Sequence, residues 1–469
     1  MSFAWTTENL LDATKGDLLC GDRGLAFSGV SIDSRNISDG NVFVAIKGNI
    51  YDAHDFISDV ICRGVRGVIA EKDKTGTLPL EKWEKEGTVC LSVKDSIRAL
   101  GDLASFQLKR SNASVIAITG SNGKTTTRGL TASVVRQKYN TLETMGNFNN
   151  EIGLPLTLFN LDPKHNWAVL ELGMNHPGEI SRLAEVCMPE IGVITNIGRA
   201  HLEGVGNIEG VMNAKGELLT SLGVNGKAVL NIDDPMVMRL AEKTSAEVTL
   251  FGISKEAAIR AESVESNDTG ISFTLVLPDE TIDIEMNITG DFMVSNALAA
   301  AAVGRLAGVG ARGIKKGIEC FRPVQGRMNI IETRNNIHIL DDTYNANPDS
   351  MQAAIHTLSS VKGEERGFVV IGDMYELGNR SEELHEVVGE LVGRSGMTKL
   401  YIFGEYADSV AKGAKTENMK TEKILKGTRE EIFSDIIENL DAGDWVLVKG
   451  SRAMSMEKIV NRLVKWGNG

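Results

Sequence analysis

Features that would mark a secreted, membrane or zinc protein are absent from this chain of 469 residues. Its five cysteines (Cys20, Cys62, Cys90, Cys187 and Cys320) lack Cys-x-x-Cys spacing, which favours free thiols over zinc ligands or disulfides. No apolar run approaches membrane-spanning length, and the N-terminus lacks a basic segment followed by an apolar one. We therefore expect a cytoplasmic protein with no membrane span.

An excess of basic residues is also missing. Lys and Arg number 50 and Asp and Glu number 63, so the formal net charge is −13. This balance makes nucleic acid an unfavourable partner, and an anionic substrate must be bound by local cationic groups. The hydrophobic content of 42% describes an ordinary globular protein, and the length predicts about three domains.

The most informative stretch runs from residue 115 to residue 127. A strand-like run of small and β-branched residues enters a glycine-containing turn, and a helical pattern then extends from Lys124 to about residue 139. This order is typical of a phosphate-binding loop, in which Lys124 reaches the β- and γ-phosphates and Thr125 holds Mg²⁺. The loop is shortened, because Ile118 stands where the common spacing has glycine. The other predicted phosphate-loop residues are Thr119, Gly120, Ser121, Asn122, Gly123 and Thr126.

Two further polar residues follow strand-like runs. Glu171 lies near the end of the run at 167–173, and His201 comes shortly after the run at 191–197. Ligands bind at the carboxyl ends of strands in an open α/β sheet, so both positions suit a metal beside the phosphates. The spacing leaves alternatives open, because Glu171 could pair with an arginine and His201 could be structural.

The pattern of elements predicts a three-domain α/β fold. Residues 1–95 carry short elements of a small α/β domain, and residues 96–320 form a central phosphate-loop domain. Residues 321–469 alternate strands and helices, which predicts a Rossmann-like domain with a parallel sheet and crossover helices. In the first domain, Ser34 beside Arg35 could bind a pyrophosphate or a nucleobase carbonyl, or form a turn with a solvated arginine.

Several longer motifs carry a resemblance. They are Glu171-Leu172-Gly173-Met174-Asn175, Thr195-Asn196-Ile197-Gly198-Arg199-Ala200-His201-Leu202-Glu203, Ala214-Lys215-Gly216-Glu217, Gly326-Arg327-Met328, Asp341-Asp342-Thr343-Tyr344-Asn345-Ala346-Asn347-Pro348-Asp349-Ser350-Met351, Gly372-Asp373-Met374-Tyr375-Glu376-Leu377-Gly378 and Lys449-Gly450-Ser451-Arg452. With the phosphate loop, they make nearly the whole chain similar to the ATP-dependent Mur ligases of peptidoglycan synthesis. The stretches at 344–348 and 372–378 resemble the branch that adds a dipeptide.

The chain departs from this family at two places. Gly290-Asp291-Phe292-Met293 stands where the family usually has Gly-x-His-Asn, and Phe292 could still stack on a purine. Asp52-Ala53-His54 stands where Asp-Gly-His is common, in the loop expected near uridine.

The resemblance implies an activity and a set of partners. It implies a monomeric ligase that uses ATP to join D-alanyl-D-alanine to the terminal carboxylate of UDP-N-acetylmuramoyl-tripeptide through an acyl phosphate. Two Mg²⁺ ions are implied, the first held by Thr125 and Glu171 and the second by His201 and Lys215. Lys215 would be carbamylated, although its helical position alone favours a surface ion pair with a neighbouring glutamate.

The remaining roles are also implied by the resemblance. The nucleotide would contact Asn296, Arg327 and Asp342. The substrates would contact Ser34, Arg35, Asn149, Tyr344, Asn345 and Asn347, with Ser34 and Arg35 facing the UDP part.

Two alternatives remain open on the sequence. One is another amide-forming ligase of the same family, such as a different Mur ligase or folylpolyglutamate synthase. The other is a nucleotide switch, although the chain has no Asn-Lys-x-Asp motif for guanine. For a ligase, the C-terminal domain must swing onto the central one, and we expect a hinge at 321–325 and a modest, polar interface.

Overall fold

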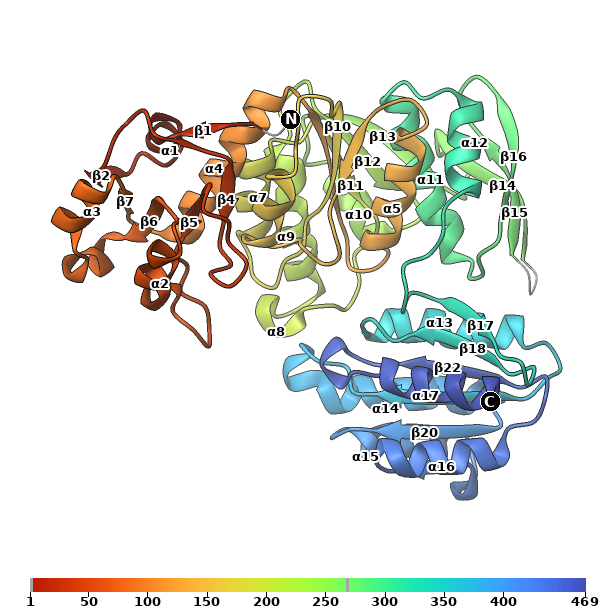
Figure 1. Cartoon of the computed structure of the whole chain (residues 1–469). Coiled ribbons are helices and arrows are strands. Elements are labelled where there is room, and N and C mark those ends of the chain that lie inside the picture. The colour runs from red at the N-terminus through yellow and green to blue at the C-terminus, as the bar shows by residue number, and fades with distance from the viewer. Residues whose placement is uncertain (1–2, 267–269) are drawn as a thin grey trace.

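Three large β-sheets, each with its own helices, follow one another along the chain in the computed structural model, which describes residues 3–266 and 270–469 (Figure 1). The sheet of the N-terminal unit lies at one end of the molecule. The central unit lies beside it, and the C-terminal unit lies below the central one. This arrangement confirms the predicted three-part α/β fold.

The N-terminal sheet has five strands in the order β2-β7-β6-β5-β4, parallel except for the pair of β2 with β7. Its strands are β2 (Asp17–Cys20), β4 (Gly29–Ser31), β5 (Asn41–Val44), β6 (Gly67–Glu71) and β7 (Val89–Val93). A separate small ladder joins β1 (Trp5–Thr6) to β3 (Ala26–Phe27). The helices are α1 (Thr7–Thr14), α2 (Ile57–Cys62) and α3 (Leu80–Glu86).

Helix α4 (Ser96–Ser111) links the first two units. The Asp95 side chain accepts a hydrogen bond from the backbone N–H of Arg98 and so caps the N-terminus of the helix. Leu100 and Leu103 pack into the N-terminal core, whereas Ala104 and Leu108 belong to the core of the central unit. One helix therefore contributes to both cores, and the boundary that we place at 95/96 stays a prediction.

The central sheet has nine strands in the order β16-β15-β14-β13-β12-β11-β8-β10-β9. They are β8 (Ser114–Thr119), β9 (Thr141–Glu143), β10 (Trp167–Glu171), β11 (Ile191–Ile194), β12 (Lys227–Asn231), β13 (Glu247–Gly252), β14 (Ile259–Ser266), β15 (Ile271–Val276) and β16 (Thr281–Met286). The helices are α5 (Lys124–Val135), α6 (Gly153–Leu158), α7 (Glu179–Cys187), α8 (Leu202–Val205), α9 (Ile208–Ser221), α10 (Pro235–Ala241), α11 (Phe292–Leu306) and α12 (Ala311–Glu319).

The register of the three middle strands positions the site. Strand β8 is parallel to both β10 and β11, with Ile118 opposite Glu171 and Thr119 opposite Ile194. Parallel strands present their carboxyl ends at one edge, so the phosphate loop after β8 and the chain after β11 emerge there together, next to Glu171 at the end of β10.

Three features of the central unit differ from the predictions. Strands β14, β15 and β16 form antiparallel hairpins that the sequence analysis did not assign, although Ile271, Phe273 and Leu275 alternate with less buried neighbours as a half-buried strand requires. Strand β13, just before them, was not assigned either. Helix α5 ends at Val135 and is followed by turns rather than continuing to residue 139.

The C-terminal sheet has six strands in the order β17-β18-β22-β19-β20-β21. They are β17 (Asn329–Glu332), β18 (His338–Asp342), β19 (Gly367–Gly372), β20 (Lys399–Phe403), β21 (Ile424–Lys426) and β22 (Trp445–Lys449). The helices are α13 (Pro348–Val361), α14 (Ser381–Arg394), α15 (Ala407–Thr416), α16 (Arg429–Asn439) and α17 (Glu457–Asn468). The parallel sheet is confirmed except at one edge, where β17 pairs antiparallel with β18 because only a short turn joins them.

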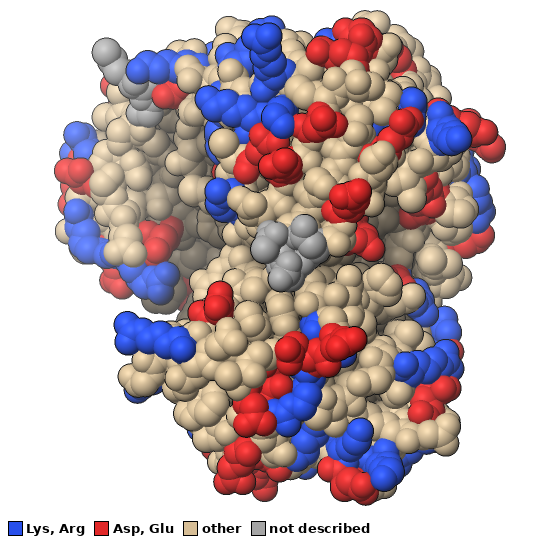
Figure 2. Space-filling view, turned by 90° about the vertical axis from the view of Figure 1, so that its right-hand side faces the viewer, with Lys and Arg blue, Asp and Glu red and all other residues tan. Residues whose placement is uncertain are grey.

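A continuous apolar cluster runs from the central unit into the C-terminal one, including Leu202 and Ile197 on one side and Ala346 and Leu377 on the other. The interface therefore has an apolar part that the expectation of a modest, polar interface did not include. On the face drawn in Figure 2, acidic and basic side chains are interspersed. No helix in the described parts of the chain is both long enough and apolar enough to cross a membrane.

Candidate active site

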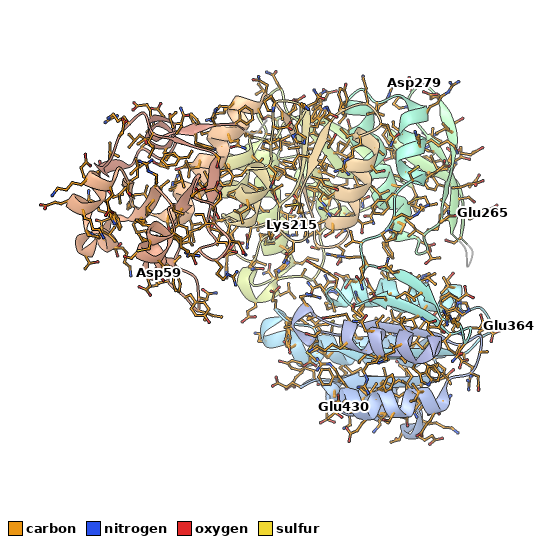
Figure 3. All side chains as sticks on the ribbon, in the orientation of Figure 1. Asp59, Lys215, Glu265, Asp279, Glu364 and Glu430 are labelled. Atoms are coloured by element: carbon orange, nitrogen blue, oxygen red, sulfur yellow. The ribbon has the colours of Figure 1, made fainter. Side chains whose placement is uncertain are left out.

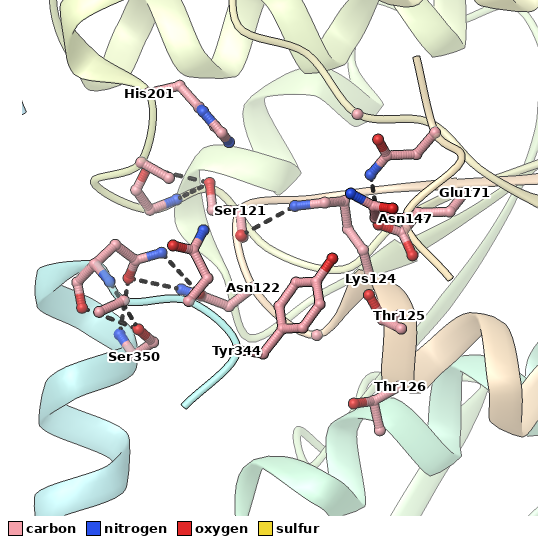
Figure 4. A pocket seen from close by; sticks show the side chains of 18 of the residues that line it. Ser121, Asn122, Lys124, Thr125, Thr126, Asn147, Glu171, His201, Tyr344 and Ser350 are labelled. Carbon is pink, nitrogen blue, oxygen red and sulfur yellow. Dashed lines mark hydrogen bonds between the residues drawn. The ribbon is translucent and has the colours of Figure 1, made fainter. Parts of the chain in front are cut away.

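A cavity of about 1000 Å³ lies between the central and C-terminal units, at the carboxyl edge of the central sheet (Figure 4). Most of the predicted site residues line it. They are Ser121, Asn122, Gly123, Lys124, Thr125, Thr126, Asn149, Glu171, His201, Asn296, Arg327, Asp342, Tyr344, Asn345 and Asn347. The lining does not include Thr119, Gly120, Lys215, Ser34 or Arg35.

Close packing explains the glycines of the phosphate loop. A Cβ at Gly120 would lie 1.9 Å from Thr195 Oγ1, and a Cβ at Gly123 would lie 2.4 Å from Asn296 Oδ1. Gly123 also has a φ of 78°, in the left-handed region that favours glycine. These contacts hold the loop against β11 and α11, so that helix α5 begins at Lys124 with its N-terminus toward the cavity.

The Lys124 side chain folds back on its own loop. Its Nζ donates hydrogen bonds to the carbonyls of Gly120 (2.8 Å) and Ser121 (3.2 Å), as Figure 4 shows in part. Burial lowers the pKa of Lys124, and the nearby Glu171 carboxylate opposes that shift. A cation that is held by two carbonyls at a helix N-terminus is placed to exchange these partners for phosphate oxygens.

Glu171 is a buried carboxylate with one unused oxygen. Its Oε1 accepts a hydrogen bond from Asn149 Nδ2 (2.8 Å), and its backbone N–H donates to Thr144 Oγ1 (3.0 Å). Within the described residues Oε2 is buried and has no hydrogen-bond partner, and no arginine pairs with this side chain. A buried carboxylate oxygen without a partner is costly, and a divalent cation would satisfy it.

Lys215 is even more isolated. Helix α9 places it in the interior of the central unit, where it is 0% exposed (Figure 3). Its Nζ has no hydrogen-bond partner in the described parts of the chain. Burial lowers the pKa of Lys215 well below its usual value, the positive charge of Lys124 adds to the shift, and Glu171 opposes it. The surface ion pair with a glutamate is therefore wrong, since Glu217 instead accepts hydrogen bonds from two backbone N–H groups.

His201 contacts the C-terminal unit. It has a φ of 56°, which is unfavourable for a residue with a side chain, and its Nδ1 lies 2.6 Å from Glu376 Oε2. Burial lowers the pKa of His201, and the charges of Lys124 and Lys215 add to the shift, whereas Glu376 raises it. A neutral imidazole can ligate a metal. The sequence analysis gave Glu376 no role, although it quoted the motif at 372–378 that contains it.

The C-terminal unit faces the phosphate loop with Arg327. Its Nη2 donates to Thr125 Oγ1 (2.9 Å), and its guanidinium carbon lies 3.9 Å from the ring centre of Tyr344. Behind it, Asp342 pairs with the buried Lys449, whose Nζ also donates to the carbonyl of Asn345 (2.8 Å). Lys449 was quoted in a motif but given no role by the sequence analysis.

Asn296 and Asn347 also form hydrogen bonds at the cavity. Asn296 Oδ1 accepts from Thr127 Oγ1 (3.1 Å) on helix α5. Asn347 exchanges amide hydrogen bonds with Asn122 of the phosphate loop, across the two units. The prediction that Asn347 binds substrate stays a prediction, as do the other residue roles.

Ser34 and Arg35 lie in the N-terminal unit, away from the cavity. Arg35 is exposed and pairs with Asp33 at 3.0 Å, and the carbonyl of Ser34 accepts a hydrogen bond from Arg63 Nη2 (2.6 Å). The structure therefore does not bring these two residues together with the phosphate loop.

The donor set for a metal is sparse. Over residues 3–266 and 270–469, no three His, Cys, Asp or Glu side chains gather in a way that could hold a metal ion. A Mg²⁺ ion next to the phosphate loop would depend on the Glu171 carboxylate, the Thr125 hydroxyl and oxygens brought by the substrates. Magnesium is commonly bound in this way beside phosphates.

Comparisons with known proteins agree with this geometry. The Mur ligase middle domain matches residues 118–304, the glutamate ligase domain of Mur ligases matches residues 326–452, and the catalytic domain of the Mur ligase family matches residues 26–107. The chain belongs to the Mur ligase family. The resemblance seen in the sequence is confirmed, and a nucleotide switch is not consistent with this membership.

Individual relatives extend over the whole chain. The UDP-N-acetylmuramoyl-tripeptide–D-alanyl-D-alanine ligase of Escherichia coli is 34% identical over 98% of this chain and 99% of its own length. A crystal structure of MurF from Acinetobacter baumannii has a TM-score of 0.90 at 30% identity, with 99% of each chain covered. The MurF ligase of Thermotoga maritima in complex with ADP has a TM-score of 0.82 at 29% identity, covering 93% of this chain and 97% of its own.

The isolation of Lys215 makes a prediction about stability. In CO₂-free buffer at pH 7, Lys215→Met should raise the free energy of unfolding by roughly 1–3 kcal/mol, because a thioether removes an unsatisfied buried amine. The gain should shrink as the pH rises toward about 10.4, since below that pH the unfolded lysine binds a proton that the folded amine does not.

Chemical denaturation across this pH range measures the effect, and Lys138→Met on the surface is the control. A Lys215→Met variant that is less stable than the parent at every pH would contradict the isolation of this amine.

Proposed function

We propose that this protein is an ATP-dependent ligase that joins D-alanyl-D-alanine to the terminal carboxylate of UDP-N-acetylmuramoyl-tripeptide, in peptidoglycan precursor synthesis. One observation carries the proposal. Beside a phosphate loop, Glu171 Oε2 and Lys215 Nζ are buried without a partner in the described residues, as expected of a site completed by cations and anionic substrates. The activity named for the full-length relatives supports the choice of substrates.

ATP would be bound from both sides of the cavity. Lys124 and the backbone N–H groups of the loop face the triphosphate, and Arg327 approaches the same place from the C-terminal unit through Thr125. Asp342 and Asn296 would contact the nucleoside part. Loop residues Thr119, Gly120, Ser121, Asn122, Gly123 and Thr126 complete the binding site.

Two Mg²⁺ ions would be held at the sheet edge, one by Thr125 and Glu171 and one by His201 and a carbamylated Lys215. Burial favours the neutral form of the Lys215 amine by lowering its pKa, and a neutral amine adds to CO₂ to give a carbamate and one proton. The carbamate offers two anionic oxygens where an ammonium offers none. When bound, the metals would offset the repulsion between a carboxylate nucleophile and the triphosphate.

The ligase reaction then has two steps. An oxygen of the tripeptide carboxylate attacks the γ-phosphorus of ATP, which releases ADP and forms an acyl phosphate. The amine of D-alanyl-D-alanine attacks the acyl carbon, inorganic phosphate leaves, and the nitrogen loses a proton. Lys124 and Arg327 place positive charge beside the transferred group, and closure of the two units around the cavity would keep water from the acyl phosphate.

The substrates would extend beyond the cavity. Ser34 and Arg35 would contact the UDP part in the N-terminal unit, and Asn149, Tyr344, Asn345 and Asn347 would contact the peptide and the dipeptide. The boundaries at 95/96 and 320/321, a monomeric state and a cytoplasmic location belong to the same proposal. The alternative of another ligase of this family is distinguished by its different acceptor.

A turnover assay tests the proposal. ADP release should require both UDP-N-acetylmuramoyl-tripeptide and D-alanyl-D-alanine, and Lys124→Ala should lower kcat by roughly a hundredfold or more because it removes a charge from the transferred phosphate. Lys138→Ala is a matched control, since Lys138 binds the carbonyl of Gly308 on the surface. Equal ADP release with glutamate in place of the dipeptide would contradict the proposed acceptor.

Chemical rescue tests the role of Lys215. Lys215→Ala should be nearly inactive, and formate or acetate should restore part of the activity by placing a carboxylate in the vacated space. Lys215→Met should stay inactive in the same buffers because its side chain fills that space. The carbamate would be refuted by two results together. Neither variant would be rescued, and a ¹³C spectrum of the ¹³CO₂-treated parent would lack a lysine carbamate signal.

A further inference from the structure

The segment 198–203, which follows strand β11 and carries His201, is held from both sides by the C-terminal unit. The N-terminal end of helix α13 lies on one side of it, and the loop 373–377 lies on the other. Both contacts join parts of the chain that are more than 140 residues apart. The segment is therefore one of the places where the two halves of the cavity meet.

The strongest of these contacts joins Arg199 to Asp349. The Asp349 carboxylate accepts three hydrogen bonds from Arg199, from the backbone N–H (2.6 Å), from Nε (2.9 Å) and from Nη2 (2.6 Å). The Arg199 and Asp349 side chains are 32% and 31% exposed. A planar guanidinium that binds one carboxylate through two donors, with a backbone donor added, fixes orientation as well as distance.

The same helix end reaches the phosphate loop. Asn347, the residue that caps α13, donates from Nδ2 to Asn122 Oδ1 (2.8 Å) and accepts from Asn122 Nδ2 (3.4 Å). Figure 4 shows Asn122, one partner in this contact, in the region between Ser121 and Ser350. The start of α13 therefore contacts the loop that faces ATP and the segment that carries His201 at the same time.

On the other side, Glu376 contacts the segment twice. Its carboxylate lies 2.6 Å from His201 Nδ1, and its carbonyl accepts a hydrogen bond from the backbone N–H of Glu203 (3.0 Å). Since His201 has the unfavourable φ of 56°, its position depends on contacts that hold the segment in place.

We propose that the Arg199–Asp349 pair positions the C-terminal unit on the central one, and that Arg199 is a positioning residue for the ligase reaction. The pair aligns Arg327 with the phosphate loop and holds the 198–203 segment, so that His201 faces the cavity. The expected effect of the pair on turnover rests on the proposed function. The expected effect of the pair on domain closure does not depend on which substrates the enzyme uses.

Closure is tested by small-angle scattering of the full chain with and without a non-hydrolysable ATP analogue and Mg²⁺. The parent should become more compact with these ligands, and Arg199→Ala should require at least severalfold more analogue for the same change. Arg239→Ala is the matched control, because Arg239 pairs with Glu209 inside the central unit, and this pair does not join the two units. Equal compaction of Arg199→Ala and the parent, or no compaction of the parent, would overturn the proposal.

A double-mutant cycle tests the effect on turnover. Arg199→Ala and Asp349→Asn should each lower kcat by roughly tenfold, with a smaller change in KM for ATP, because binding to the central unit persists while alignment is lost. The combined variant should be no slower than the slower single variant. Independent effects that multiply in the combined variant would refute the pair as a unit.

The two experiments separate the two proposals. A parent that closes with the ATP analogue but forms no amide from UDP-N-acetylmuramoyl-tripeptide and D-alanyl-D-alanine refutes the proposed function only. If the parent forms the amide, and Arg199→Ala closes and turns over as the parent does, only the positioning role is refuted.

Discussion

The ionisable side chains of Lys124, Glu171 and Lys215 are shielded from water at one edge of the central sheet, and the rest of the site follows from that arrangement. Neither Glu171 nor Lys215 has a partner for every buried polar atom among the described residues. Burial of unpaired polar groups is costly, so the fold must hold these side chains in place without local compensation. The register of β8, β10 and β11, and the packing of α9 beneath them, supply that constraint.

The second half of the site comes from a different sheet. Arg327, Tyr344, Asp342 and Lys449 of the C-terminal unit line the cavity. Arg327 reaches the phosphate loop across an interface that has an apolar cluster as well as hydrogen bonds. Such a division suits a reaction with a water-sensitive intermediate. We expect substrates to enter when the units are apart and the charged groups to come together as water is excluded.

The sequence predicted the strands and loops that carry chemistry better than it predicted the rest. The phosphate loop, Glu171 and His201 could be placed because each follows an apolar run, and such runs form the inner strands of a parallel sheet. The hairpins β14–β16 were missed because half-buried strands leave a weaker signal. A strand at 329–332 was predicted, but its antiparallel pairing with β18 was not. Glu376 and Arg199 could not be recognised, since their roles depend on contacts between distant segments. Lys215 was the least predictable from its own position, because a lysine in a helix near Asn213 and Glu217 is expected to be exposed, and only the packing of α9 shows that it is buried.

The central claim of this account is that the edge of the sheet transfers a phosphoryl group to a carboxylate. The most direct test is to label the terminal carboxylate of UDP-N-acetylmuramoyl-tripeptide with ¹⁸O and to analyse the inorganic phosphate formed with ATP and D-alanyl-D-alanine by mass spectrometry. Formation and breakdown of an acyl phosphate predict one ¹⁸O atom in each phosphate released. Amide formation with unlabelled phosphate would contradict the account.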